Sequence, residues 1–365
     1  YWSITSTYDL QENTADMIAT YNREGDWLDG QFYQRQHYHT WTIDDGSFEN
    51  AWNGAFQGIM QCSSVLDDLE KLNPTEFGFT AGEFNTFKMG LRTTRAWLYI
   101  NAFDLFRNIP LAVSLDIEKN SKGQIPPQEM FDFIETELKD ALANLPLKQG
   151  TDGNGLQQGQ WNKAGAAALL VRLYLNAEKW IGTPKYTDCA TYAQKIIDGE
   201  YGSYEIADRW DAPFDWNNET CDEVIYAFTG ALTRAHWQYD NSTLWWSLPA
   251  RSPDYFGFKD WGNANPKFAL QPSRDIDGNL YKFDLGMPVA KFQKYPEDIR
   301  LKLYKNLDGE SKREGMFLFG YLEYKENGVT KRVMNPGRSY ELYIRDQVGL
   351  FRGADPNTVI ADKES

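Results

Sequence analysis

Residues 161–180 read WNKAGAAALLVRLYLNAEKW, and this stretch decides the fold class. From residue 162 to residue 180 the run is apolar almost all round, which indicates a helix enclosed by its neighbours. Small residues occupy the consecutive positions 164–168 and let a neighbouring helix approach closely. We therefore expect a helix over residues 162–180 that packs against other helices.

Helical patterns continue on both sides of this stretch. Apolar residues recur at helical spacing, and a Pro-Pro pair marks one helix start, where the first turn does not need the missing N–H. The resulting pairs of helices joined by turns are typical of stacked helical repeats, so the expected fold is mostly α. The further predicted helices cover residues 49 to about 73, 81–106, 126–144 and 186–198.

The composition changes on either side of the helical part, which divides the chain into residues 1–48, 49–200 and 201–365. Residues 8–22 are interpreted as a loop or a lead-in. Residues 23–48 mix Gly, Asp and aromatic residues without a sustained period, which predicts a long surface loop. The first part is therefore expected to carry an aromatic surface loop.

The last part, residues 201–365, is interpreted as loop-rich. Residues 232–287 combine Gly, Pro, Asn, Trp and Tyr without a period, whereas residues 223–228 suit a short strand and residues 296–303 a short helix. Asn327-Gly328 is the kind of dipeptide that forms the turn of a β-hairpin. We expect an irregular region with one hairpin.

The charge balance excludes some classes of partner. The chain has 37 Lys and Arg against 52 Asp and Glu, a formal net charge of −15, which argues against nucleic acid and against anionic lipid headgroups. A neutral or cationic partner fits this charge, as does a charge that only keeps the protein soluble. No run of about 18 apolar residues occurs, so no membrane span is predicted. The three cysteines lie far apart without zinc spacing and are interpreted as buried thiols.

The aromatic content of 15%, with 13 Trp, is the unusual feature of the composition. A buried indole N–H needs a hydrogen-bond partner, so we expect some of these rings to face solvent or a ligand. Aromatic residues at helical spacing are assigned to packing instead, namely Trp52, Phe56, Trp97, Tyr99 and Tyr174.

Four motifs resemble the SusD/RagB family. GLRTTRAWLYINAFDLFRNIPL, residues 90–111, resembles a family helix in which an Arg-Ala-aromatic stretch leads to a Pro-Leu end. Residues 161–180, followed by Tyr-x-x-x-Ala and then IIDGEY, resemble its alanine-rich helix. AWNGAFQGIMQCSSVLDDL, residues 51–69, resembles its early helix, with Ser63-Ser64 near the usual Asn. KYPEDIRLKLY, residues 294–304, resembles its Asp-Pro-Arg segment without the proline.

This resemblance covers roughly residues 50–305 and implies a function. It implies a non-catalytic, lipid-anchored protein at the cell surface, on the outer membrane of a Gram-negative bacterium. Such a protein captures polysaccharide or oligosaccharide and delivers it to a SusC-like TonB-dependent transporter. The implied fold has TPR-like helix pairs that form a helical scaffold with a loop-rich ligand-binding region. Because the family is normally longer, we expect this chain to lack a C-terminal portion as well as the lipid anchor.

Two aromatic clusters supply the candidate ligand-binding residues. A pyranose ring has apolar C–H faces and a polar rim, so aromatic faces and hydrogen-bonding side chains together suit it. The alternative is that most of these side chains fix loops onto the scaffold. If residues 245 and 246 are extended, they point to opposite faces and only one of them faces a sugar. The candidates are Trp27, Asp29, Tyr33, Arg35 and Trp41 in the first cluster, and Trp245, Trp246, Tyr255 and Trp261 in the second.

No metal or cofactor is predicted. An extended H-x-H segment such as His37-Tyr-His39 places both imidazoles on one side, but no third ligand is evident nearby beyond Asp44 and Asp45. We interpret them as hydrogen-bonded loop histidines. Residues 275–279, DIDGN, lack the spacing of an EF-hand, so calcium is left open as an unproven alternative.

Catalysis is not predicted either. Glycoside hydrolysis needs two carboxylates across a sugar, and the pairs Asp26/Asp29 and Asp44/Asp45 are the nearest candidates in an aromatic loop. No sequence context marks them, and no P-loop, GxGxxG, GxSxG or HExxH motif occurs. The two alternatives to glycan capture are a glycoside hydrolase and a helical-repeat scaffold that binds another protein.

Overall fold

The computed structural model divides the chain into two compact units, residues 1–240 and residues 241–365. The residues that it describes are 6–20, 28–148, 159–214, 218–229, 294–295, 297–298, 300, 304–306, 318–332 and 343–344. The first unit holds the helices, and the second unit holds a small sheet. The described part is mostly helical, as the sequence predicts.

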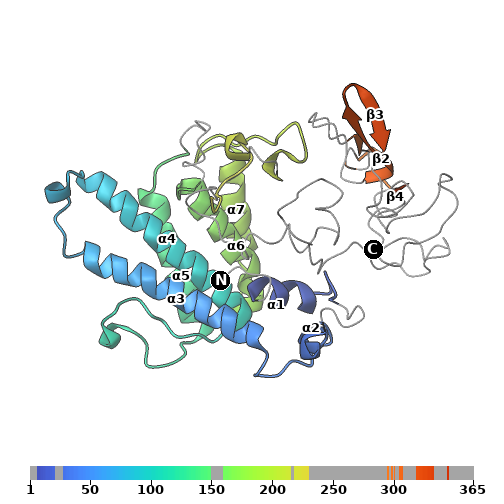
Figure 1. The fold of residues 1–365 in the computed structure, drawn as a ribbon. Coiled ribbons are helices and arrows are strands. Elements are labelled where there is room, and N and C mark those ends of the chain that lie inside the picture. Colours follow the sequence, from blue (N-terminus) through green and yellow to red (C-terminus); the bar gives the residue numbers. More distant parts are fainter. Residues whose placement is uncertain are drawn as a thin grey trace. The chain divides into compact units, whose positions relative to one another are not determined.

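The first unit follows the predicted order of helices (Figure 1). Short 3-10 turns, η1 to η5, lie between or after them at Asp29–Gln31, Pro74–Phe77, Ile117–Lys119, Ala212–Phe214 and Asn218–Thr220. The helices are α1 (Thr7–Thr14), α2 (Phe32–His37), α3 (Gly46–Leu69), α4 (Ala81–Phe106), α5 (Pro127–Asn144), α6 (Lys163–Ile181) and α7 (Tyr186–Ile197).

The ends of the long helices are set by capping groups. The hydroxyl of Thr80 accepts the N–H of Glu83 at 3.2 Å, and the Glu83 carboxylate accepts the N–H of Thr80 at 2.9 Å, so α4 begins with a capping box. The side chain of Asn162 accepts the N–H of Gly165 and caps α6. Gly182 ends α6 with a φ of 75°, which favours glycine. These signals explain why the predicted helix bounds are confirmed to within a few residues.

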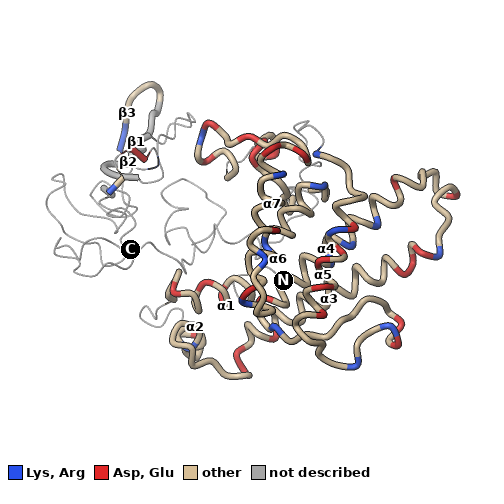
Figure 2. The backbone as a smooth tube through the Cα atoms, turned by 180° about the vertical axis from the view of Figure 1, so that it is seen from behind, with Lys and Arg blue, Asp and Glu red and all other residues tan. Residues whose placement is uncertain are grey.

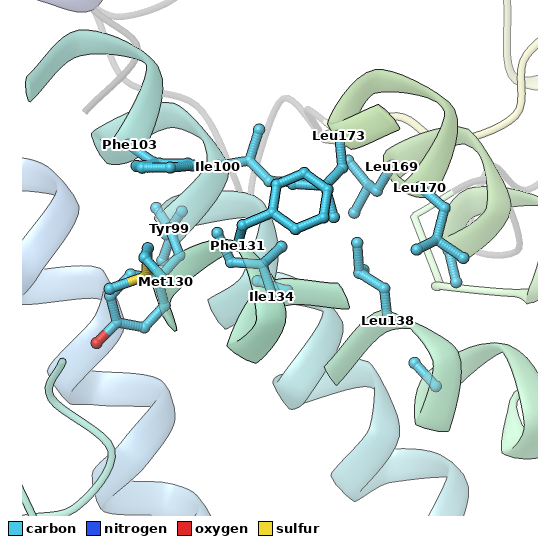
Figure 3. Packing of buried hydrophobic residues seen from close by; sticks show 14 of the residues in the cluster. Tyr99, Ile100, Phe103, Met130, Phe131, Ile134, Leu138, Leu169, Leu170 and Leu173 are labelled. Carbon is cyan, nitrogen blue, oxygen red and sulfur yellow. The ribbon is translucent and has the colours of Figure 1, made fainter. Parts of the chain in front are cut away.

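Each long helix from α3 to α7 packs against the next one along the chain, and α4 also contacts α6. The core therefore lies between α3, α4, α5 and α6, as Figure 3 shows for part of it. The aromatic residues assigned to packing lie in this core or against it. The buried side chains labelled there are Tyr99, Ile100 and Phe103 of α4, Met130, Phe131, Ile134 and Leu138 of α5, and Leu169, Leu170 and Leu173 of α6.

Small residues permit the close contacts between helices. A Cβ added at Gly58 of α3 would lie 2.7 Å from Cδ1 of Leu98 on α4. In α6, Ala164, Ala166 and Ala167 are fully buried. The burial of these alanines agrees with the predicted packing of α6 against other helices.

A buried ion network joins α4 to α5. The carboxylate of Glu137 accepts from Nη2 of Arg92 at 2.6 Å and from Nη2 of Arg95 at 2.7 Å. Nη1 of Arg95 also donates to the hydroxyl of Ser63 on α3 and to the carbonyl of Val113. The network thus fixes three helices and the connection between α4 and α5.

The N-terminal part differs from the prediction, because it holds two short helices where loops were expected. Helix α1 begins at Thr7 and covers the first part of residues 8–22, and η1 with α2 lies within residues 23–48. Both helices are rich in polar residues, and only short stretches of them are buried, so neither has a long apolar stripe. The loop prediction is therefore wrong for residues 8–14 and 29–37, whereas residues 38–45 are turn and irregular backbone as expected.

In its described residues the second unit has four strands: β1 (Tyr304–Asn306), β2 (Leu318–Glu326), β3 (Val329–Arg332) and β4 (Tyr343–Ile344). Strand β2 pairs antiparallel with β3 and β4 and parallel with β1. Asn327 and Gly328 join β2 to β3 with φ of 51° and 78°, so the predicted hairpin is confirmed. The strand predicted at residues 223–228 is wrong, because those residues are turn and irregular backbone.

Other predictions fall outside the described residues, including most of the short helix at 296–303 and the whole of residues 232–287. The division at residues 48 and 200 stays a prediction. Within the described part, no helix combines the length and the apolar character that crossing a membrane requires.

Candidate functional site

Four of the nine candidate ligand-binding residues lie in the described part of the chain: Asp29, Tyr33, Arg35 and Trp41. All four lie in residues 29–45, the segment that includes η1 and α2 and ends directly before α3. Trp27 and the whole second cluster lie outside the described residues, namely Trp245, Trp246, Tyr255 and Trp261.

Tyr33 is an interior residue of this segment. Its side chain is only 3% exposed, and its ring lies 3.8 Å from that of Phe32, centroid to centroid. Burial, with the charges of Asp9 and Asp29 added, raises the pKa of the Tyr33 hydroxyl well above its ordinary value. Tyr33 is therefore on the buried face of α2, and its ring is not accessible to a ligand in this arrangement.

Arg35 is held by protein groups. Its Nε lies 3.3 Å from Oδ2 of Asp45, its Nη2 pairs with Oδ1 of the same carboxylate, and its Nη1 donates to the carbonyl of Gly30 at 2.6 Å. The Arg35 hydrogen bonds lower the pKa of the Asp45 carboxyl, against the opposing effect of burial, and the N–H of Thr42 lowers it further. The guanidinium thus links η1 to the residue before α3.

Of the two aromatic candidates in the described part of the chain, Trp41 is the exposed one, with 43% of its surface accessible. Its ring lies 5.4 Å from that of His39 and 6.0 Å from that of Phe48, measured between centroids. We call these three rings the Trp41 platform. Tyr38 and Ile43, in the same segment, are 65% and 97% exposed. The segment therefore presents an aromatic and apolar surface to solvent.

Both histidines of the H-x-H pattern contact α1 or the turn after it. Nε2 of His39 lies 3.0 Å from the carbonyl oxygen of Thr14, so that nitrogen donates a hydrogen bond. Nδ1 of His37 lies 3.3 Å from Oδ1 of Asp16. Among the described residues, no group of three His, Cys, Asp or Glu side chains could hold a metal ion. The interpretation as hydrogen-bonded histidines agrees with the contact of His39, whereas Nδ1 of His37 lies within ion-pair distance of Asp16 without a hydrogen bond.

The backbone of the segment is strained at two places. Asp29, Gly30 and Gln31 have φ of 37°, 62° and 66°, and His39 has φ of 56°. Residues other than glycine rarely adopt such angles, and each costs about 1–3 kcal/mol unless its surroundings enforce it. The bonds of Arg35 to Gly30 and of His39 to Thr14 supply contacts at both places.

The carboxylates of the segment have different environments. Asp29 and Asp44 are exposed, whereas Asp45 is 3% exposed and paired with Arg35. Exposed carboxylates such as that of Asp44, three positions after Trp41 in the sequence, suit hydrogen bonding to hydroxyl groups. Asp45 is a buried ion with its hydrogen-bonding groups already occupied by Arg35 and Thr42.

The sequence prediction missed the contribution of Phe48 to the platform. It also considered Asp45 as part of a carboxylate pair with Asp44, whereas Asp45 is paired with Arg35. Phe48 stands in the first turn of α3, so its ring was assigned to neither cluster. Asp45 directly precedes that helix at the N-cap position, which is the one sequence signal that separates it from Asp44.

Charged residues of both signs alternate along the helices of the first unit. Figure 2 shows blue and red positions interspersed on the tube, without a long blue stretch among the described residues. This distribution agrees with the exclusion of a polyanionic partner.

A family model that matches this chain and three similar proteins are all SusD or SusD-like. A SusD-like family model, described as "Starch-binding associating with outer membrane", matches residues 5–175. The starch-binding protein SusD of Bacteroides thetaiotaomicron is 28% identical over 171 residues, which are 46% of this chain and 28% of that protein. The matched region contains the Trp41 platform and helices α1 to α5.

Solved structures show the same fold. A SusD superfamily protein from Parabacteroides distasonis matches with a TM-score of 0.59 and 19% identity, over 81% of this chain and 55% of that chain. A SusD-like protein from Bacteroides fragilis matches with a TM-score of 0.55 and 17% identity, over 76% and 51%. The chain thus spans about half the length of these structures and about a quarter of the curated relative.

Proposed function

Because a SusD-like family model matches residues 5–175, we propose that this chain is a non-catalytic glycan-binding protein that holds carbohydrate on the Trp41 platform. The observation that carries the proposal is the exposure of Trp41, flanked by the rings of His39 and Phe48, in a segment fixed at both ends. The similarity to a starch-binding protein of Bacteroides thetaiotaomicron supports a glycan as the ligand.

The physical argument concerns the two surfaces of a sugar. The C–H face of a pyranose is apolar and stacks on an aromatic ring, while its hydroxyl groups need donors and acceptors. Trp41 supplies the ring, and the exposed side chains of Thr42 and Asp44 adjoin it in the sequence. A neutral polymer with many hydroxyl groups also meets no electrostatic penalty from a net charge of −15.

A hydrolytic role finds no support in this segment. A glycoside hydrolase needs a general acid whose pKa is raised and a second carboxylate at a defined separation. The pKa of Asp45 is lowered by its pairing with Arg35, so it is unsuited to donate a proton at neutral pH. Of the other carboxylates weighed for this role, Asp29 and Asp44 are exposed and Asp26 lies outside the described residues.

We propose further that the protein acts at the cell surface as a lipid-anchored component of the outer membrane and passes glycan to a SusC-like TonB-dependent transporter. The family description, which mentions association with the outer membrane, supports the location. Co-purification of the full-length protein with such a transporter from solubilised outer membranes tests the partnership. Recovery of the protein without any transporter would contradict it.

Affinity electrophoresis tests the glycan proposal directly. The wild-type chain is run in native gels containing soluble starch, laminarin or xyloglucan, beside the variants Trp27→Ala, Trp41→Ala, Trp246→Ala and Trp261→Ala. Retardation of the wild type and its loss in Trp41→Ala are expected. Phe77→Ala is the matched control, because Phe77 is 58% exposed but lies in η2 outside this segment. Retardation of all four variants to the same extent as the wild type would contradict an aromatic binding surface.

A further inference from the structure

We infer that Arg35 and Asp45 form a positioning pair that holds the Trp41 platform in its binding arrangement, and that neither side chain contacts the glycan. This inference rests on the proposed function of the platform. It assigns Arg35, which the sequence places among the ligand-binding residues, a role that acts through Trp41.

Asp45 lies beneath the turn that follows Trp41. Its carboxylate accepts the N–H of Thr42 at 3.1 Å, and its own N–H donates to the carbonyl of Thr42 at 3.2 Å. Its carbonyl accepts the N–H of Phe48 at 3.1 Å, in the first turn of α3. With 3% exposure, Asp45 fixes the backbone on the C-terminal side of Trp41 from a position that no ligand reaches.

Arg35 fixes the backbone on the other side. Its carbonyl accepts the N–H of Thr40 at 2.8 Å, and its guanidinium bonds both Gly30 and Asp45. Trp41 therefore lies between Thr40 and Thr42. The N–H of Thr42 is bonded to the Asp45 carboxylate. The N–H of Thr40 is bonded to the main-chain carbonyl of Arg35, a residue whose guanidinium anchors it to Gly30 and Asp45. The donors Nε, Nη1 and Nη2 of Arg35 are all directed to protein acceptors, so the guanidinium is engaged before a ligand arrives.

A preformed arrangement matters for affinity, because a ligand that must order the segment loses the corresponding free energy. Ordering the backbone of a single residue is equivalent to about a five- to thirtyfold change in the dissociation constant. The positive φ of His39, next to Thr40, makes this segment the part of the platform that most depends on such support. Breaking the pair is therefore expected to weaken binding without removing any group that touches the sugar.

Two alternatives for Arg35 make opposite predictions about Asp45. If the pair positions the platform, Arg35→Gln, Asp45→Asn and the double variant each weaken glycan binding by about five- to thirtyfold. The double variant then binds no more weakly than the single variant with the lower affinity. If Arg35 instead binds the sugar directly, Asp45→Asn retains or improves affinity, because it frees the guanidinium. Asp45→Asn is a conservative change, since the amide oxygen still accepts the N–H of Thr42.

The experiment measures dissociation constants by isothermal titration, with the glycan that retards the wild type in the gels as the probe. Lys71→Gln is the control, because Lys71 forms an exposed ion pair with Asp68 near the other end of α3. Circular dichroism confirms that each variant is folded. Wild-type affinity in Asp45→Asn, with or without a loss in Arg35→Gln, would overturn the inference.

Hydrogen exchange of peptides covering residues 38–48 gives a readout that does not depend on the ligand. Faster exchange there in both single variants, with unchanged exchange in α4, is expected. If the wild type binds none of the glycans, the proposed function fails while this readout still decides whether the pair holds the segment. Unchanged exchange in both variants would refute the positioning role.

Discussion

Glu137→Gln removes the charge that Arg92 and Arg95 share between α4 and α5. The side chain of Glu137 is 7% exposed, and that of Arg95 is also 7% exposed, so the arginine would remain buried beside a neutral amide. Removing one partner of a buried pair costs about 3–5 kcal/mol, because an uncompensated charge is left in the interior. For a unit of this size the expected fall in melting temperature is roughly 6–20 °C.

Thermal unfolding followed by circular dichroism at the helix band measures this effect. Lys139→Gln is the control on the same helix, since Lys139 pairs with Glu135 at the surface, where its side chain is 49% exposed. That variant is expected to lose no more than about 0.5 kcal/mol. A fall in stability of Glu137→Gln that matches the control would show that the network contributes little, and would refute the reasoning.

Three further predictions follow from particular contacts. The pKa of Asp45 is lowered in the folded protein, so its contribution to stability is present above the unfolded pKa and is lost as the pH falls below about 4. The protection of residues 38–48 against hydrogen exchange, corrected for the intrinsic exchange rate at each pH, should decrease there in the wild type, and an equal decrease in Asp45→Asn would disprove this. Gly90→Ala should stabilise the protein by about 0.5–1 kcal/mol, because a Cβ at Gly90 meets open space. Gly58→Ala should lack that gain, because its Cβ would meet the side chain of Leu98. Urea unfolding of both variants checks that Gly90→Ala is the more stable. Treatment with a chelator should leave glycan binding unchanged, and a loss restored by calcium in the titration would point to a metal site.

The helical scaffold was predictable from the sequence because its signals are local and repeated. The apolar periodicity of residues 81–106 and the Thr80–Glu83 box define α4, and Asn162 and Gly182 define the ends of α6. Helix α2 was missed since six residues are too short to show a helical period. The loop geometry around it depends on contacts between distant residues, which no periodicity records.

The candidate site was predictable as a region but not residue by residue. Trp41 was found as an exposed aromatic residue, but composition alone gives no means of separating it from Tyr33, which is 3% exposed. The role of Arg35 depends on Asp45, ten positions away, so residue type suggested a sugar contact where the structure has an ion pair. The ligand-binding role of every candidate stays a prediction, including those in the second cluster.

The most direct test of glycan capture on the Trp41 platform compares the dissociation constants of Trp41→Ala and Phe77→Ala with that of the wild type, by isothermal titration with soluble glycan. Truncating an aromatic residue at the centre of an interface costs about 2 kcal/mol or more, so Trp41→Ala should bind at least roughly thirtyfold more weakly. Phe77→Ala should bind like the wild type. Wild-type affinity in a folded Trp41→Ala variant would contradict the account.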